Sequence, residues 1–140
     1  MKAMYPACFY IEENGVSVIF PDLNWLATGG DTVDDAMNYA IDCLAGYLYI
    51  KQKEGNQIPA PSDISSIDPI KLARELDPED EPGNGFVSYV TVDVDAYAKE
   101  HFEKAVKKTL TIPAWLNKLA MENNVSFSKV LQEALIKALL

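Results

Sequence analysis

The stretch Lys107-Lys108-Thr109-Leu110-Thr111-Ile112-Pro113 shapes the expected fold of this chain more than any other. Its residues alternate, so that in a strand the two aliphatic side chains share one face, whereas the first lysine and both threonines share the other. A single strand with an open backbone edge and a half-apolar face requires a partner. We expect that partner to be the same strand of a second copy, paired as an antiparallel ribbon. Because a two-stranded ribbon fits the DNA major groove, the stretch predicts both dimerisation and DNA binding.

Two short helical patterns follow the predicted strand. Pro113 suits the first turn of a helix, where its missing N–H would have no partner, and this helix should end near Glu122. Asn124 can adopt the left-handed conformation that commonly ends a helix, and Ser126 can cap a second helix. The apolar face of that second helix is too large for one copy to bury. It comprises Val130, Leu131, Ala134, Leu135, Ala138 and Leu139.

Strand, helix, turn and Ser-capped helix over residues 106–139 resemble the ribbon-helix-helix (βαα) family of bacterial repressors. The resemblance implies an intertwined dimer that places Lys107, Thr109 and Thr111 against base edges of operator double-stranded DNA. It also implies that backbone amides at the start of the second helix bind phosphate. The expected phosphate contacts are Lys108, Ser126, Phe127, Ser128 and Lys129, and the expected dimer core is Leu110, Ile112, Leu131 and Leu135. A plain dimerisation module is the alternative, because β-propensity alone can explain the threonines.

Charge is divided unevenly along the chain. The net charge of −9 argues at first against nucleic-acid binding, since phosphates must be neutralised by Lys and Arg. However, residues 1–100 hold 18 Asp and Glu against six Lys and Arg, a net charge of −12, whereas residues 101–140 hold six Lys against three Glu, a net charge of +3. Such asymmetry indicates two functions. We therefore expect an acidic domain over residues 1–100 and a DNA-binding and dimerisation domain over residues 106–140.

The bulk composition excludes several classes of protein. Cys8 and Cys43 are too few and too widely spaced for a disulfide framework or a zinc site, and no charged-then-apolar leader opens the chain. No apolar run approaches the length of a membrane span, because Asp42 and Lys51 interrupt the richest one. We expect a cytoplasmic protein without a membrane partner, associated with the nucleoid when it binds DNA.

The acidic domain begins with a predicted hairpin. Residues 5–11 and 16–20 are rich in aromatic and β-branched residues, and Asn14-Gly15 between them is typical of a type I′ turn. A third, shorter strand is expected over residues 25–28. Thr32 can cap a long helix that reaches about Lys53, because apolar residues recur there at intervals of three and four.

The second half of this domain alternates loop and regular structure. Residues 55–85 contain five prolines and predict a long connection, with a short helix near residues 70–76. Loops of this length are usually functional or loosely ordered. Residues 86–93 show the clearest alternation in the chain and predict a fourth strand, followed by an amphipathic helix over residues 95–105. The expected fold class is α+β, with the order βββαβ.

A resemblance to a known family rests on motifs in the first third of the chain. Phe20-Pro21-Asp22-Leu23, Thr28-Gly29-Gly30-Asp31-Thr32 and Asp35-Ala36 resemble the signature of HicB antitoxins, with Asn24-Trp25-Leu26 where the family often has a turn such as Pro-Gly-Cys. The similarity covers most of residues 4–54 and extends to the tail. It implies a partial ribonuclease-H-like fold without catalysis, which binds a HicA-like toxin, a small mRNA-cleaving ribonuclease, and masks its active site.

Neither a catalytic nor a metal site is expected. A two-metal nuclease needs carboxylates that converge, but Asp22, Asp31 and Asp93 fall at strand ends, where turns and helix caps explain them. The single histidine, His101, has no interpretable nucleophile beside it and is expected to be a solvated helix residue. Core or dimer packing explains the remaining aromatic candidates better than base stacking. These are Tyr39, Tyr47 and Tyr49.

The combined interpretation is a HicB-type antitoxin that is not an enzyme and needs no cofactor. Its acidic domain would neutralise a HicA-like ribonuclease, and its tail would repress its own operon as a homodimer, or as a tetramer if dimers pair. Two alternatives stay open at this point. One is a metal-dependent nuclease of ribonuclease-H-like fold with a DNA-targeting tail, and the other is a ligand-sensing ribbon-helix-helix repressor.

Overall fold

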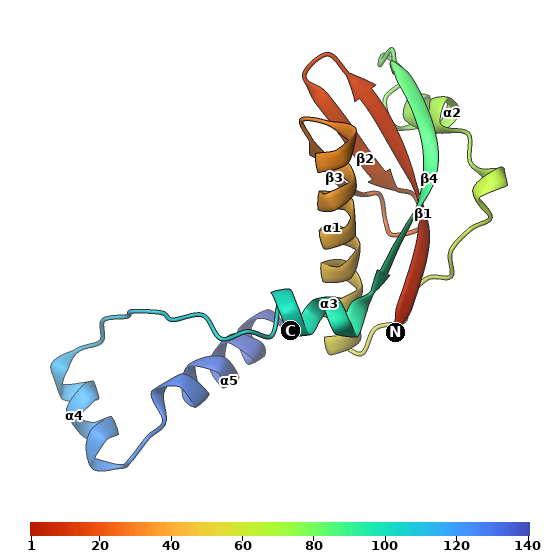
Figure 1. Cartoon of the computed structure of the whole chain (residues 1–140). Coiled ribbons are helices and arrows are strands. Elements are labelled where there is room, and N and C mark those ends of the chain that lie inside the picture. Colours follow the sequence, from red (N-terminus) through yellow and green to blue (C-terminus); the bar gives the residue numbers. More distant parts are fainter. The chain divides into compact units, whose positions relative to one another are not determined.

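The computed structural model describes all 140 residues, and the chain forms two compact units. The first, Met1–Lys104, is called the body, and the second, Ala105–Leu140, is called the tail unit. Their elements can be followed in Figure 1. Each unit is described by itself.

The body begins with the predicted hairpin, which the structure confirms. Strand β1 (Lys2–Glu12) pairs antiparallel with β2 (Gly15–Phe20), and the ladder closes at the pair Glu12–Gly15. The turn residues are therefore Glu13 and Asn14, and neither has a positive φ, so the predicted Asn14-Gly15 type I′ turn is wrong. Gly15 instead has φ 145° and lies against the next strand, where a Cβ would approach the carbonyl oxygen of Gly30 to 2.7 Å.

The third strand, β3 (Leu26–Gly30), differs from the prediction at both ends. Trp25 was expected inside it, but Trp25 and Asn24 have φ values of 61° and 55° and belong to the turn that reverses the chain after β2. Gly29 and Gly30 were expected to end the strand, yet both pair with β2. Glycine serves there because a Cβ on either residue would collide with backbone atoms of β2 or of the following helix.

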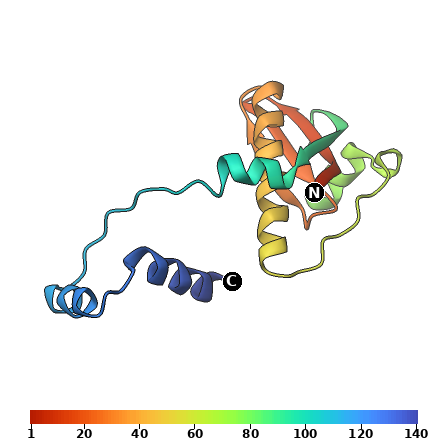
Figure 2. The ribbon, with the colours of Figure 1, turned by 60° about the horizontal axis from the view of Figure 1, so that its bottom comes forward.

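Helix α1 (Val33–Lys53) forms over the predicted residues. The Thr32 side chain accepts a hydrogen bond from the Asp35 N–H at 3.1 Å and caps the helix. Figure 1 and Figure 2 show α1 against one face of the sheet. The main core lies between them and is built from small helical residues facing large strand residues, such as Phe9 and Phe20, which are fully buried.

The rest of the body completes the sheet. A 3₁₀ turn, η1 (Ile64–Ser66), and helix α2 (Pro69–Leu76) precede strand β4 (Asn84–Asp93), which is followed by helix α3 (Val94–His101). Strand β4 pairs antiparallel with β1, so the order across the sheet is β3-β2-β1-β4. A fourth strand and the short helix α2 are thus confirmed.

Helix α3 is shorter than the predicted 95–105. It ends at His101 because the next residue, Phe102, turns its ring onto Tyr49 and Tyr97, with centroids 5.6 and 5.5 Å away. The side chains that follow are exposed. No packing is therefore available to stabilise a further turn of helix.

The long connection is tied to the body by side chains of the sheet and its turns. Tyr5 donates a hydrogen bond to the Pro59 carbonyl (2.5 Å), and Tyr10 donates one to the Pro69 carbonyl (2.8 Å). Helix α2 packs on the second face of the sheet, where Ala73 lies with Cys8 and Tyr10 in a smaller core. None of the helices combines the length and the apolar character that crossing a membrane requires.

The tail unit contains two helices. Helix α4 (Ala114–Glu122) ends before Asn124, whose φ of 54° is the predicted left-handed conformation, and α5 (Phe127–Leu139) follows. Ser126 occupies the N-cap position of α5, but its side chain makes no capping hydrogen bond, so the predicted side-chain cap is wrong. Residues 105–113 form neither helix nor strand in the single chain. The strand expected over residues 107–112 would have its partner in a second copy, and it stays a prediction.

Candidate nucleic-acid and dimer interface

The tail unit buries none of its side chains. Leu110 is 56% exposed, and Leu135 and Leu139 are 49% and 75% exposed, whereas the body buries its aliphatic core almost completely. A unit of helices this short derives its stability mainly from the packing of an apolar face. The tail unit therefore needs another surface to cover its exposed apolar side chains.

The uncovered apolar side chains surround one large groove. Its volume is about 1010 Å³, and its lining comes entirely from the tail unit. Residues 105–113, called the extended segment below, contribute Val106, Lys108, Leu110 and Ile112, all of even number. The two helices and the turn between them contribute the rest of the apolar lining, which comprises Leu116, Leu119, Ala120, Val125, Phe127, Val130, Leu131 and Ala134.

The alternation divides the predicted contact residues between two sides of the extended segment. The predicted base contacts Lys107, Thr109 and Thr111 are exposed and do not line the groove. Of the predicted dimer core, the groove brings together Leu110, Ile112 and Leu131, but it does not include Leu135. Lys108 lies among the lining residues, as its even position in the alternation leads one to expect.

Four of the five predicted phosphate contacts, residues 126–129, lie at the start of α5, whereas the fifth, Lys108, lines the groove. The first backbone hydrogen bond of this helix is donated by Val130 to the Ser126 carbonyl at 3.0 Å, so the preceding N–H groups have no partner within the helix. No side chain caps them, since the Ser126 hydroxyl makes no such bond. The side chains of Phe127 and Ser128 line the groove. Binding of an anion here would therefore use backbone N–H groups and the helix dipole, with Lys129 exposed beside them.

Two of the three carboxylates considered in the nuclease alternative, Asp22 and Asp93, serve the structure of the body. Asp22 accepts hydrogen bonds from the Ser62 N–H (2.8 Å) and hydroxyl (2.5 Å) and ties down the long connection. Asp93 accepts from the Ala96 N–H at 3.2 Å and caps α3, and this bond holds the pKa of Asp93 below its usual range. No three or more His, Cys, Asp or Glu side chains lie close enough together to hold a metal ion. For Asp31 the structure gives no hydrogen bond.

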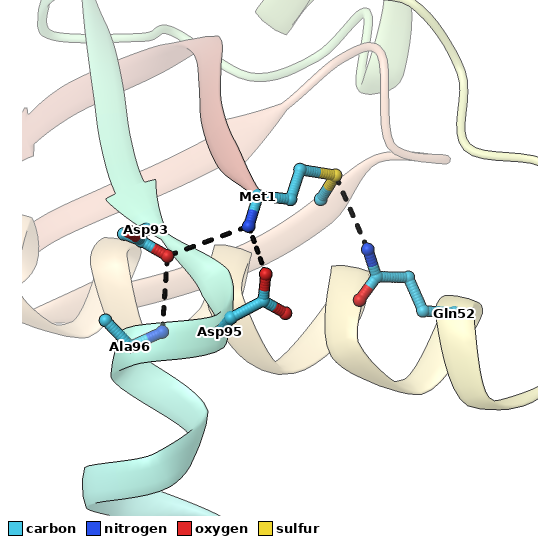
Figure 3. Close-up of polar contacts among 5 residues, drawn as sticks. All are labelled: Met1, Gln52, Asp93, Asp95 and Ala96. Atoms are coloured by element: carbon cyan, nitrogen blue, oxygen red, sulfur yellow. Dashed lines mark hydrogen bonds and ion pairs between the residues drawn. The ribbon is translucent and has the colours of Figure 1, made fainter.

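Figure 3 shows how Met1 contacts the Asp93 side chain that caps α3. The Met1 ammonium lies 3.7 Å from an Asp93 oxygen and contacts the Asp95 carboxylate, and its sulfur accepts a hydrogen bond from the Gln52 amide at 3.4 Å. The hydrogen bond to Asp95 is the main reason that the pKa of this ammonium is raised. The contacts hold the start of β1 against the junction of β4 and α3.

The other aromatic and histidine candidates lie on or near α1. His101 is exposed and stacks on Tyr97, with ring centroids 4.0 Å apart. Tyr47 and Tyr49 are partly buried and pack against the main core, which confirms core packing for both. Tyr39 is 58% exposed, so it does not pack in the core of the single chain, and dimer packing for this residue stays a prediction.

One charged feature was not predicted. A smaller cavity of about 270 Å³ on the second face of the sheet is lined in part by apolar side chains, including Tyr10, Ile19 and Leu76. Four acidic residues also line it, Glu12, Asp77, Asp80 and Glu81. The acidic run after α2 was visible in the sequence, but its approach to the end of β1 depends on the path of the long connection.

Comparison with known proteins gives one sequence match and several structural ones. No model of a known protein family matches the chain. A stretch of 58 residues is 38% identical to Antitoxin HicB 2 of Photorhabdus laumondii and covers 41% of this chain and 42% of that relative. The chain thus matches less than half of the curated relative's length.

Solved structures extend the similarity to the whole chain. A chain of a toxin–antitoxin complex from Streptococcus pneumoniae aligns over 99% of each chain, with a TM-score of 0.67 and 32% identity. A chain of a HicA3 and HicB3 toxin–antitoxin complex aligns over 65% of this chain and 99% of that one, with a TM-score of 0.50 and 25% identity. These matches confirm the resemblance that the Gly29-Gly30 motif and its neighbours indicated. The chain therefore belongs to the HicB antitoxin family.

Proposed function

We propose that this protein binds and neutralises a HicA-like, mRNA-cleaving ribonuclease through its body and represses its own operon through a dimer of its tail unit. The observation that carries the repressor half is the division of the extended segment into an apolar side that lines the groove and a Lys-Thr side that does not. The proposal gives the chain no catalytic role. It treats the body as a partial ribonuclease-H-like fold acting in the cytoplasm, or at the nucleoid when the tail is on DNA.

The toxin half of the proposal draws on the family and on charge. One aligned complex is named for a HicA and a HicB protein, and the net charge of −12 over residues 1–100 suits a basic RNA-binding partner. A small cavity lined by both apolar and acidic residues fits a long cationic side chain, whose stem is apolar and whose tip is charged. Toxin binding therefore belongs to the body in this proposal.

Growth rescue tests the toxin half. Cells that express a HicA-like toxin should survive when they also express residues 1–104, and the toxin should co-purify with this fragment. The tail unit alone should do neither, and the full chain is the positive control. A fragment with the far-ultraviolet circular dichroism of a folded body that neither binds nor rescues would refute this division of function.

The repressor half follows from placing two tail units together. A second copy of the extended segment would fill the space above each groove, and the paired strands would turn Lys107, Thr109 and Thr111 outward on the same face. The unpartnered N–H groups at the start of α5 then supply phosphate contacts on either side of the ribbon. A threonine side chain discriminates only modestly between bases. Specificity would therefore depend on all six base-contacting side chains of the dimer, three from each copy, and on paired half-sites.

Operator binding tests this half directly. Replacing Lys107, Thr109 and Thr111 together by Ala should weaken binding to the DNA upstream of the chain's own coding sequence by at least about 10³-fold in physiological salt. Toxin neutralisation should be unchanged. Lys137→Ala, which removes a positive charge from the last turn of α5, is the matched control and should bind normally. Normal affinity of the triple variant would rule out the ribbon.

A further inference from the structure

The turn between β2 and β3 holds a tryptophan in a backbone conformation that tryptophan disfavours. The Leu26 N–H donates to the Leu23 carbonyl at 3.2 Å, and the two residues between them, Asn24 and Trp25, have φ values of 55° and 61°. Positive φ at both central positions defines a type I′ turn, in which Gly, Asn and Asp dominate. Asn24 suits its position. Trp25 does not, because a bulky side chain at positive φ is rare and strained.

The packing of the body does not explain this tryptophan. Leu23 is fully buried and Leu26 packs against the main core, so these two leucines anchor the turn. Trp25 belongs to neither core and is 44% exposed. The aromatic and cation–π contacts of the body all involve other rings. A strained residue that adds nothing to a core is typical of a ligand contact.

The surroundings of the turn favour a cationic ligand. Asp22 lies three residues before Trp25, and its carboxylate accepts the two hydrogen bonds from Ser62. Asp63 follows Ser62 and is exposed. Neither carboxylate forms an ion pair within the chain. Tryptophan is the best ring for a cation–π contact, so a Lys or Arg side chain could stack on Trp25 beside carboxylates that have no cation of their own.

Charge also separates the classes of partner that could use an exposed indole. A nucleic-acid base could stack on it, but the phosphates would meet a domain with a net charge of −12 over residues 1–100. A second copy of the body would bring the same negative charge. A basic protein, in contrast, is attracted by this charge. The observations therefore favour a basic protein as the partner of Trp25.

We propose that Trp25 is a docking anchor that stacks on a Lys or Arg side chain of the basic toxin. This inference rests on the proposed function and assigns the toxin contact to one residue of the body. Tryptophan is among the residues that most often carry the binding energy of protein interfaces. Because Leu23 and Leu26 hold the turn, the backbone of Trp25 is in place before the toxin arrives, which lowers the entropic cost of binding.

Two substitutions of similar size test the ring. Trp25→Phe and Trp25→Leu both leave a bulky residue at positive φ, but only Phe keeps an aromatic face. In calorimetric titration of the full chain with toxin, Trp25→Leu should bind at least about 5-fold more weakly than Trp25→Phe. Equal affinities of the two variants, with a parent chain that binds, would overturn this inference alone. A parent chain that does not bind the toxin would refute the proposed function and this inference with it.

A fluorine label on the ring itself covers the case in which a Trp25 variant fails to fold. The chain has two tryptophans, so 5-fluorotryptophan labels Trp25 alone in a Trp115→Phe chain and Trp115 alone in a Trp25→Phe chain. The fluorine resonance of Trp25 should shift when unlabelled toxin is added, whereas that of Trp115 in the tail unit should not. An unmoved Trp25 resonance, or equal shifts at the two positions, would overturn the proposal. A shift of Trp25 on adding single-stranded RNA alone, or on concentrating the chain alone, would assign the ring to a base or to a second copy and overturn it as well.

Discussion

Replacing Gly30 by Ala should destabilise the body, because this glycine lies where β3 meets the first turn of α1. A Cβ at this position would be 2.6 Å from the Ala36 nitrogen and 2.8 Å from the Asp35 carbonyl carbon, whereas ordinary contact begins at 3.4 Å. The obstructing atoms are backbone, so the start of α1 must move by several tenths of an ångström. Overpacking of this kind costs up to about 3 kcal/mol. The lower entropy of an unfolded Ala offsets roughly 0.4–1 kcal/mol of this cost, which leaves a loss of about 2 kcal/mol.

The matched control is Gly46→Ala in the middle of α1. The only atom near a Cβ there is Phe102 Cζ at 3.7 Å, an ordinary contact, and Ala is better than Gly in a helix by roughly 1 kcal/mol. This variant should be more stable than the parent. Urea unfolding followed by Trp25 fluorescence, with Trp115→Phe in every variant, reports on the body alone. Unfolding of Gly30→Ala at the parent's urea concentration would refute the clash at the β3–α1 junction.

Local patterns in the sequence predicted most of the elements of the body, and tertiary contacts explain the failures. Helix α1 could be located because a cap, a period and an end all lie within its own residues. The hairpin was also predicted, but its turn type was not. Asn14-Gly15 is a local signal for a type I′ turn, and the turn in the structure consists of Glu13 and Asn14 instead. The position of Gly15 depends instead on its approach to Gly30, which only the packed sheet reveals.

In the candidate site, too, local patterns were predicted correctly and contacts between distant residues were missed. Alternation within one segment was enough to separate Leu110 and Ile112 from Thr109 and Thr111, because period two follows directly from strand geometry. It did not show that Leu135 lies outside the groove, since that depends on how α4 and α5 pack. The acidic lining of the smaller cavity was missed for a similar reason, because its carboxylates come from separate parts of the chain.

Three further changes test other parts of the molecule. Thr32→Ala should cost about 1 kcal/mol in urea unfolding through loss of the α1 cap, whereas Thr32→Ser should cost little. Leu110→Asp should abolish both the tail dimer in sedimentation and operator binding, while Leu135→Asp, outside the groove, should weaken them less; the reverse order would contradict the groove as the dimer surface. Burial, with a hydrogen bond to Asp42, raises the pKa of Tyr97 to about 12, so the stability this phenol contributes is present below pH 10 and lost as the pH rises through 12. The difference in unfolding free energy between wild type and Tyr97→Phe should therefore shrink between pH 10 and 12, and a constant difference would contradict the shift.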